Sequence, residues 1–87
     1  MSEKELVTEL DRLILKNHDI SEINELNPFT DLITDLAYNS LAIIQLIVQI
    51  EEKFELIFPE EYLDLSYVRQ YKWLMDFVVK EKLHNEQ

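Results

Sequence analysis

Several residue types are absent or scarce in this chain of 87 residues. It has no cysteine, so neither a disulfide nor a cysteine-ligated structural zinc can hold the fold together. It has no glycine, which excludes the glycine-rich loops that cradle phosphates in nucleotide-binding proteins. Stability must therefore come from apolar packing, for which 47% of the residues are suited.

Basic residues are also few. Eight Lys and Arg stand against eighteen Asp and Glu, a formal net charge of −10. Such a charge repels nucleic acid and anionic membranes and favours partners with basic patches. No apolar run approaches the roughly 20 residues that a membrane span needs. We expect one soluble, cytoplasmic and monomeric domain over residues 1–87 that binds neither nucleic acid nor membrane.

Apolar residues recur at helical spacing in three segments, which predicts main helices over about 2–16, 40–54 and 67–82. Ser2 and Glu5 form the pattern of a capping box at the start of the first. Ser66 is the predicted cap of the last, with Val68, Tyr71, Leu74, Met75 and Val78 as its buried stripe and Trp73 and Phe77 on its flank.

Shorter elements complete the predicted architecture. Pro59 ends any continuation of the second helix and can open a short helix over about 60–64. Residues 84–87 should fray. The fold class expected is all-α, a small four-helix bundle of three main helices and one short helix.

A long loop over residues 17–39 joins the first two helices and is rich in residues that favour turns. We expect its apolar residues to pin it across the core, with a helical turn near 31–36: Ile20, Ile23, Leu26, Phe29, Leu32, Ile33 and Leu36.

The helix predicted over 40–54 is too apolar for a single buried stripe. At about 100° per residue its apolar side chains divide into two sets. The set expected to face the core is Ile43, Leu46, Ile47, Ile50 and Phe54. The other set, Leu41, Ile44 and Val48, points outward, either buried under the long loop or used to bind a partner.

Residues suited to catalysis are not grouped in the sequence. His18 and His84 have no neighbouring nucleophile, and Glu51 and Glu52 are better explained as a solvated helix face. We expect neither a catalytic role nor a metal site. Asn39 and Ser40 are both suited to the start of a helix, so an ordinary helix cap is one interpretation of Ser40.

A motif around Ser40 suggests more. The stretch Asp35-Leu36-Ala37-Tyr38-Asn39-Ser40-Leu41 is followed by Leu46, Glu51-Glu52, Phe54 and Pro59-Glu60-Glu61. This pattern resembles the acyl carrier protein and peptidyl carrier protein family. Members share Asp-Leu-Gly-x-Asp-Ser-Leu at the start of the second helix, then Glu-Glu-x-Phe and a Pro-Asp/Glu-Glu turn. The agreement covers about Phe29 to Asp64 without a gap.

The resemblance implies an acyl-carrier-protein-like bundle with a 4′-phosphopantetheine arm on Ser40, attached by a phosphopantetheinyl transferase. The thiol of the arm would carry an acyl, polyketide or aminoacyl group as a thioester for separate loading and biosynthetic enzymes. Asn39 and Leu41 flank the attachment site. A phosphodiester on Ser40 would lie at the positive end of the helix dipole.

Two residues depart from the family pattern. Asn39 stands where the family has Asp; it retains the capping ability and loses the charge that would meet a basic transferase. Ala37 stands where the family has Gly, and because alanine enters positive φ less readily we expect a different loop backbone before the site.

The partner surface should be less acidic than in fatty-acid carriers, since Ala42 and Gln45 occupy outer positions of the helix. The predicted partner-binding residues are Leu41, Ile44, Gln45, Val48, Glu51, Glu52, Glu60 and Glu61. This favours a carrier of a specialised pathway, polyketide or peptide-like, over a general fatty-acid carrier. The alternative is an unmodified acidic helical interaction domain that retains the carrier fold.

Overall fold

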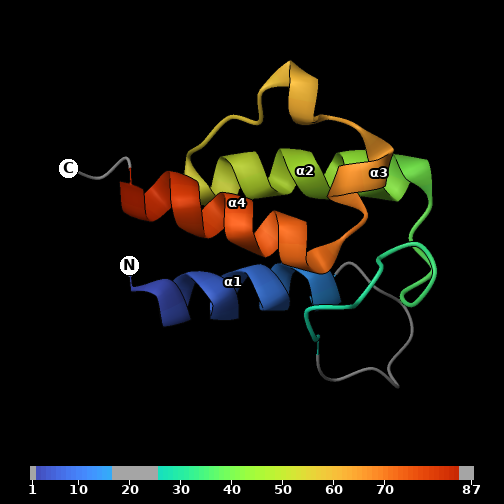
Figure 1. The fold of residues 1–87 in the computed structure, drawn as a ribbon, viewed down its shortest axis with the longest axis horizontal. Helices are drawn as coiled ribbons and strands as arrows, with labels where there is room; N and C mark the ends of the chain where they lie inside the picture. The colour runs from blue at the N-terminus through green and yellow to red at the C-terminus, as the bar shows by residue number, and fades with distance from the viewer. Residues whose placement is uncertain (1, 17–25, 85–87) are drawn as a thin grey trace.

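The computed structural model describes residues 2–16 and 26–84, and this part of the chain contains helices and no strand (Figure 1). The elements are α1 (Glu3–Lys16), α2 (Ser40–Phe54), the 3-10 helix η1 (Glu60–Tyr62), α3 (Leu65–Val68) and α4 (Tyr71–His84). The predicted all-α class is confirmed. His18, Ile20, Ile23 and residues 85–87, all of which entered the predictions, lie outside the described residues.

Helix α1 has the predicted start and one buried face. The Ser2 N–H donates to Glu5 Oε1 and the Glu5 N–H donates to Ser2 Oγ, both at 3.2 Å, which is a reciprocal capping box. Leu6, Leu10 and Ile14 are fully buried. Through this stripe α1 packs against both α2 and α4, which run back alongside it in Figure 1.

The predicted continuous helix over 67–82 is wrong. Asp64, not Ser66, is the cap: Asp64 Oδ1 accepts the Ser66 N–H at 2.8 Å and starts the single turn of α3. The chain then turns, and α4 begins at Tyr71. The Tyr71 N–H, which a continuous helix would direct to the carbonyl four residues earlier, donates instead to Thr30 O at 3.1 Å.

The same corner holds the loop that leads to α2. Leu32 N–H donates to Arg69 O at 2.7 Å, and Arg69 Nε pairs with Asp31 Oδ2 at 2.7 Å. Desolvation opposes ionisation of Asp31, but hydrogen bonds from Thr34, Arg69 and Ile33 outweigh it, so the pKa of Asp31 is lowered. Contacts remote in sequence therefore decide where the last helix divides.

The loop over 26–39 is pinned to the core at most of the predicted points. Leu32 and Leu36 are buried, and Leu26 and Ile33 pack against the core. Phe29, which was expected to join them, is 92% exposed. The Phe29 N–H donates to Asn27 Oδ1 at 2.7 Å, and the tight turn so formed directs the ring into solvent.

The short helix predicted over 60–64 is a 3-10 helix over Glu60–Tyr62. Aromatic rings on α4 hold it and α3 in place. Trp73 meets the ring of Tyr62 edge-on at 5.9 Å and stacks with that of Tyr67 at 5.8 Å. Phe77, predicted on a flank, is buried and stacks on Phe58 at 4.4 Å. This cluster positions the segment between η1 and α3 above α2.

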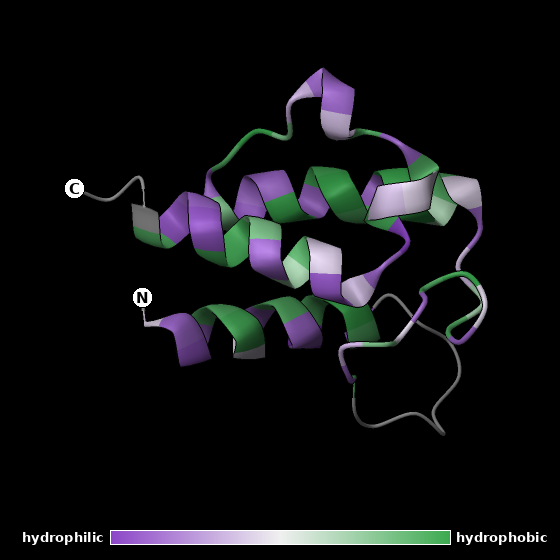
Figure 2. Cartoon of the chain, in the orientation of Figure 1, coloured by the Kyte–Doolittle hydropathy of each residue, from purple (hydrophilic) through white to green (hydrophobic). Residues whose placement is uncertain are grey.

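Hydropathy follows this arrangement. Figure 2 shows green alternating with purple along α1, α2 and α4. Of these three helices α2 is the most apolar in composition, as the sequence predicted. None of the described helices is long and apolar enough to cross a membrane.

Candidate functional site

Ser40 is the first residue of α2, and its side chain is exposed. The preceding residue, Asn39, is extended and its Oδ1 accepts the Ala42 N–H at 2.7 Å. Asn39 O accepts the Ile43 N–H at 3.0 Å. Asn39 is therefore the helix cap, so the interpretation of Ser40 as an ordinary cap is wrong. Among the described residues, none makes a hydrogen bond with the Ser40 hydroxyl.

The loop immediately before Ser40 is held by Tyr38. Its hydroxyl donates to Ile14 O at 2.7 Å, satisfying a carbonyl of the last turn of α1. Burial raises the pKa of Tyr38 to about 12. Tyr38 N–H also donates to Leu32 O at 2.9 Å. Two anchors thus fix the backbone two residues before the serine.

The expectation of a different loop backbone at Ala37 is wrong. Ala37 has φ 59°, in the left-handed region that favours glycine. The bonds of Tyr38 and the cap at Asn39 hold the backbone between Ala37 and Ser40, so the alanine is placed in this conformation despite its steric cost.

The N-terminus of α2 favours an anion at Ser40. The first turn of α2 contains no acidic residue, so the positive end of the dipole is not offset by a side chain there. The first N–H groups of a helix have no partner within it. The Ala42 N–H is satisfied by Asn39, while the N–H groups of Ser40 and Leu41 make no hydrogen bond among the described residues. A phosphodiester on Ser40 fits this environment.

The two predicted faces of α2 are present. All five residues assigned to the core are buried: Ile43, Leu46, Ile47, Ile50 and Phe54. Leu41, Ile44 and Val48 are exposed by 63%, 58% and 45%. Of the two outcomes considered for this outward set, burial under the long loop is wrong. Three large aliphatic side chains instead line one exposed stripe beside Ser40.

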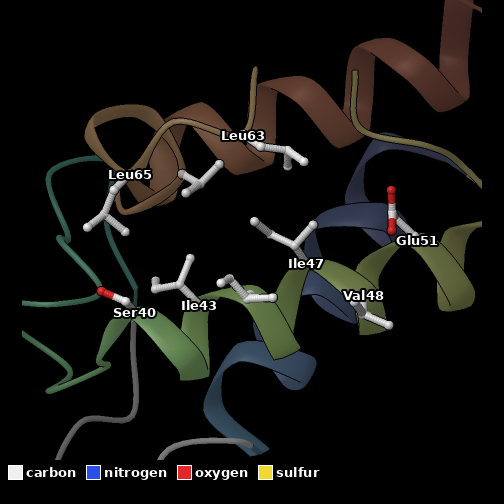
Figure 3. Close-up of a pocket in the computed structure, with 9 residues that line it drawn as sticks. Ser40, Ile43, Ile47, Val48, Glu51, Leu63 and Leu65 are labelled. Carbon is white, nitrogen blue, oxygen red and sulfur yellow. The ribbon is translucent and has the colours of Figure 1, made fainter. Parts of the chain in front are cut away.

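A cavity of about 400 Å³ runs between α2 and the segment that leads into α3 (Figure 3). In Figure 3 Leu65 lies above Ser40, and Leu63 lies above Ile47 of α2. Ser40 lies at one end and Glu51 near the other. The lining residues are Ser40, Ile43, Ile44, Ile47, Val48, Glu51, Leu63, Leu65 and Val68. Ser40 thus lies at one end of an apolar cavity.

Five of these lining residues were not predicted as part of a site. Ile43 and Ile47 were assigned to the core. Leu63 and Leu65 flank Asp64, and Val68 was assigned to the stripe of a longer helix. The only sequence signal was that Leu63 and Leu65 belonged to no helical stripe. Their place above α2 depends on the aromatic contacts of α4, which sequence spacing does not encode.

The predicted acidic partner residues differ in their surroundings. Glu52, Glu60 and Glu61 are exposed. Glu51 is half-buried, and its Oε2 accepts the Phe58 N–H at 2.9 Å. The earlier interpretation of Glu51 as a solvated face is therefore wrong, because one of its oxygens stabilises the turn after α2. Gln45 is exposed between Ile44 and Leu46.

Chemically, the site can hold a group but has little means of activating one. Among the residues that line the cavity, Glu51 alone is ionisable, and it lies at the end away from Ser40. No group of three or more His, Asp or Glu residues in the described segments is arranged to hold a metal ion.

Comparison of the chain with protein-family models, curated proteins and solved structures returned no significant match. The resemblance to carrier proteins therefore rests on the motif around Ser40 and on the residues downstream of it. The carrier function that it implies is a proposal, and the positions of Ser40 and the cavity support it.

Proposed function

We propose that this chain is a carrier protein that bears a 4′-phosphopantetheine arm on Ser40 and presents a tethered acyl, polyketide or aminoacyl intermediate to partner enzymes. The observation that carries the proposal is the position of Ser40. Its hydroxyl is exposed, is not needed as a helix cap, and stands at one end of an apolar cavity. When bound, the arm would supply a thiol for thioester formation.

Different residues of the chain would have separate roles in such a carrier. Asn39 caps α2 and leaves the N–H groups of Ser40 and Leu41 for the phosphodiester oxygens. Tyr38 fixes the loop, so the attachment point is held in place. The aliphatic walls of the cavity favour an apolar portion of arm or cargo by removing it from water.

Partner enzymes would dock on the stripe formed by Leu41, Ile44 and Val48. These side chains lie next to the attachment point and are more than 40% exposed. Gln45 and Ala42 contribute no charge, so affinity for a partner would depend more on apolar contacts than on ion pairs. Glu52, Glu60 and Glu61 would steer a basic partner toward this face. A specialised pathway fits this surface better than general fatty-acid synthesis.

The test is covalent modification of the full chain by a broad-specificity phosphopantetheinyl transferase with coenzyme A. Intact mass should rise by one phosphopantetheine, and peptide mapping should assign it to Ser40. Asn39→Asp retains the cap and adds the carboxylate typical of the family, so it should be modified at least as fast. No mass gain in either protein, or an equal gain in Ser40→Ala, would refute the carrier function.

The second candidate is an unmodified acidic interaction domain. The exposed stripe on α2 supports it, because an apolar face beside a free serine would serve a partner with or without an arm. The mass experiment separates the two functions: a chain that no transferase modifies, yet which folds normally, would be assigned to this class.

A further inference from the structure

The cavity beside α2 has one polar group at the end remote from Ser40. Seven of its nine lining residues are aliphatic, and the other two are Ser40 and Glu51. Eleven helical positions separate this pair, which corresponds to about 16 Å along the axis. An aliphatic chain that enters beside Ser40 would therefore bring its far end to a carboxylate.

The Glu51 carboxylate is fixed in place rather than freely mobile. Its Oε2 accepts the N–H of Phe58, whose ring is buried in the core. The turn that brings Phe58 back begins at Glu55, which has φ 53°, and Glu51 O accepts the Leu56 N–H at 3.2 Å. Glu51 Oε1 has no hydrogen-bond partner among the described residues.

A fixed carboxylate with one open oxygen discriminates between chain ends. A hydroxyl or ammonium group can donate to Oε1 in a charge-assisted hydrogen bond, which is stronger than a bond between neutral groups. A hydrocarbon end in the same place would displace water from the carboxylate and offer nothing in return. The aliphatic walls supply affinity for the chain, and Glu51 supplies the selection at its end.

We propose that the cavity binds a medium-length aliphatic chain whose remote end carries a hydrogen-bond donor, and that Glu51 Oε1 accepts from this donor. The inference rests on the proposed function only in identifying such a chain as the cargo. The selectivity itself belongs to the unmodified protein, so it is tested without any group on Ser40.

The full unmodified chain is titrated with 1-octanol, octylammonium and 1-methoxyoctane. Binding is measured from the amide chemical shifts of α2 and of residues 63–68. The ether matches the alcohol in chain but has no donor. We expect 1-octanol to bind about fivefold more tightly than the ether, and octylammonium more tightly than 1-octanol. Equal affinities for alcohol and ether, or no binding of any probe, would overturn the proposal.

Two variants locate the selectivity. Glu51→Gln keeps an oxygen for the Phe58 N–H but replaces Oε1 with an NH₂ donor, so the preference for alcohol over ether should disappear. Glu52→Gln removes the same charge from the neighbouring exposed position and should retain the preference. If the preference survives in Glu51→Gln, the probe hydroxyl donates to an acceptor other than Glu51, which would contradict the inference.

Failure of this inference and failure of the carrier function are separable. The probes are titrated into the chain with no group on Ser40, so their order of affinity is measured whether or not a transferase modifies the protein. Normal phosphopantetheine transfer with no discrimination among the probes would leave the carrier function and remove the selectivity. Discrimination among the probes without phosphopantetheine transfer would leave the selectivity and remove the carrier function.

Discussion

Substitution of Ala37 by glycine should stabilise the protein, although glycine usually weakens a fold. Ala37 has φ 59° and an exposed side chain, so its methyl group makes no core contact that would be lost. An L-residue in the left-handed region costs about 1–2 kcal/mol. Glycine avoids this cost but loses about 0.5–1 kcal/mol through the greater freedom of the unfolded chain. The net expectation for Ala37→Gly is a gain of about 0.5–1 kcal/mol.

The only other alanine in the chain provides the matched control. Ala42 lies inside α2 and packs against the core, so Ala42→Gly should cost about 1 kcal/mol or more. Urea denaturation gives the free energy of unfolding for both, and in a domain of this size 1 kcal/mol corresponds to about 4–8 °C in Tm. Loss of stability in Ala37→Gly, or the same sign of change at both positions, would refute the backbone strain assigned to Ala37.

Two further outcomes follow from the site. Because the pKa of Tyr38 is raised to about 12 in the fold, its stabilising contribution is present below about pH 10 and is lost as pH rises toward 12. Denaturant titrations between these pH values should show a smaller fall in stability for Tyr38→Phe, and identical falls would contradict this role. Ile44→Glu should retain the helical circular dichroism spectrum but slow phosphopantetheine transfer, whereas the adjacent Ile43→Glu should unfold the chain because Ile43 is only 1% exposed. Equal loss of helicity in both would place Ile44 in the core.

Local pattern was sufficient for the elements whose signals lie within a few residues. The capping box of Ser2 and Glu5, the stripe of α1 and both faces of α2 follow from 3.6-residue periodicity and cap chemistry, which operate within one or two helical turns. Ser40 at the start of α2 could be predicted for the same reason. The motif around it resembles that of carrier proteins, and the carrier function remains a proposal.

Tertiary contacts decided the remainder. The Tyr71 N–H could serve a longer helix or the carbonyl of Thr30, and only packing of the loop against the α3–α4 corner selects the second. Phe29 could enter the core on hydropathy alone, but the turn at Asn27 directs it outward. Backbone strain at Ala37 likewise depends on anchors at Tyr38 that form across the bundle.

The amino-acid sequence by itself therefore determined the class of fold, the two faces of α2 and the exposed serine at its start. It did not determine the cavity beside that serine, because the segment of Leu63 and Leu65 is held over α2 by contacts of the Tyr62 and Tyr67 rings with Trp73. Nor did it show that Glu51 faces this cavity with one oxygen bound and one open. Periodicity encodes which face of a helix is buried, whereas the group that covers that face is chosen by contacts between distant parts of the chain.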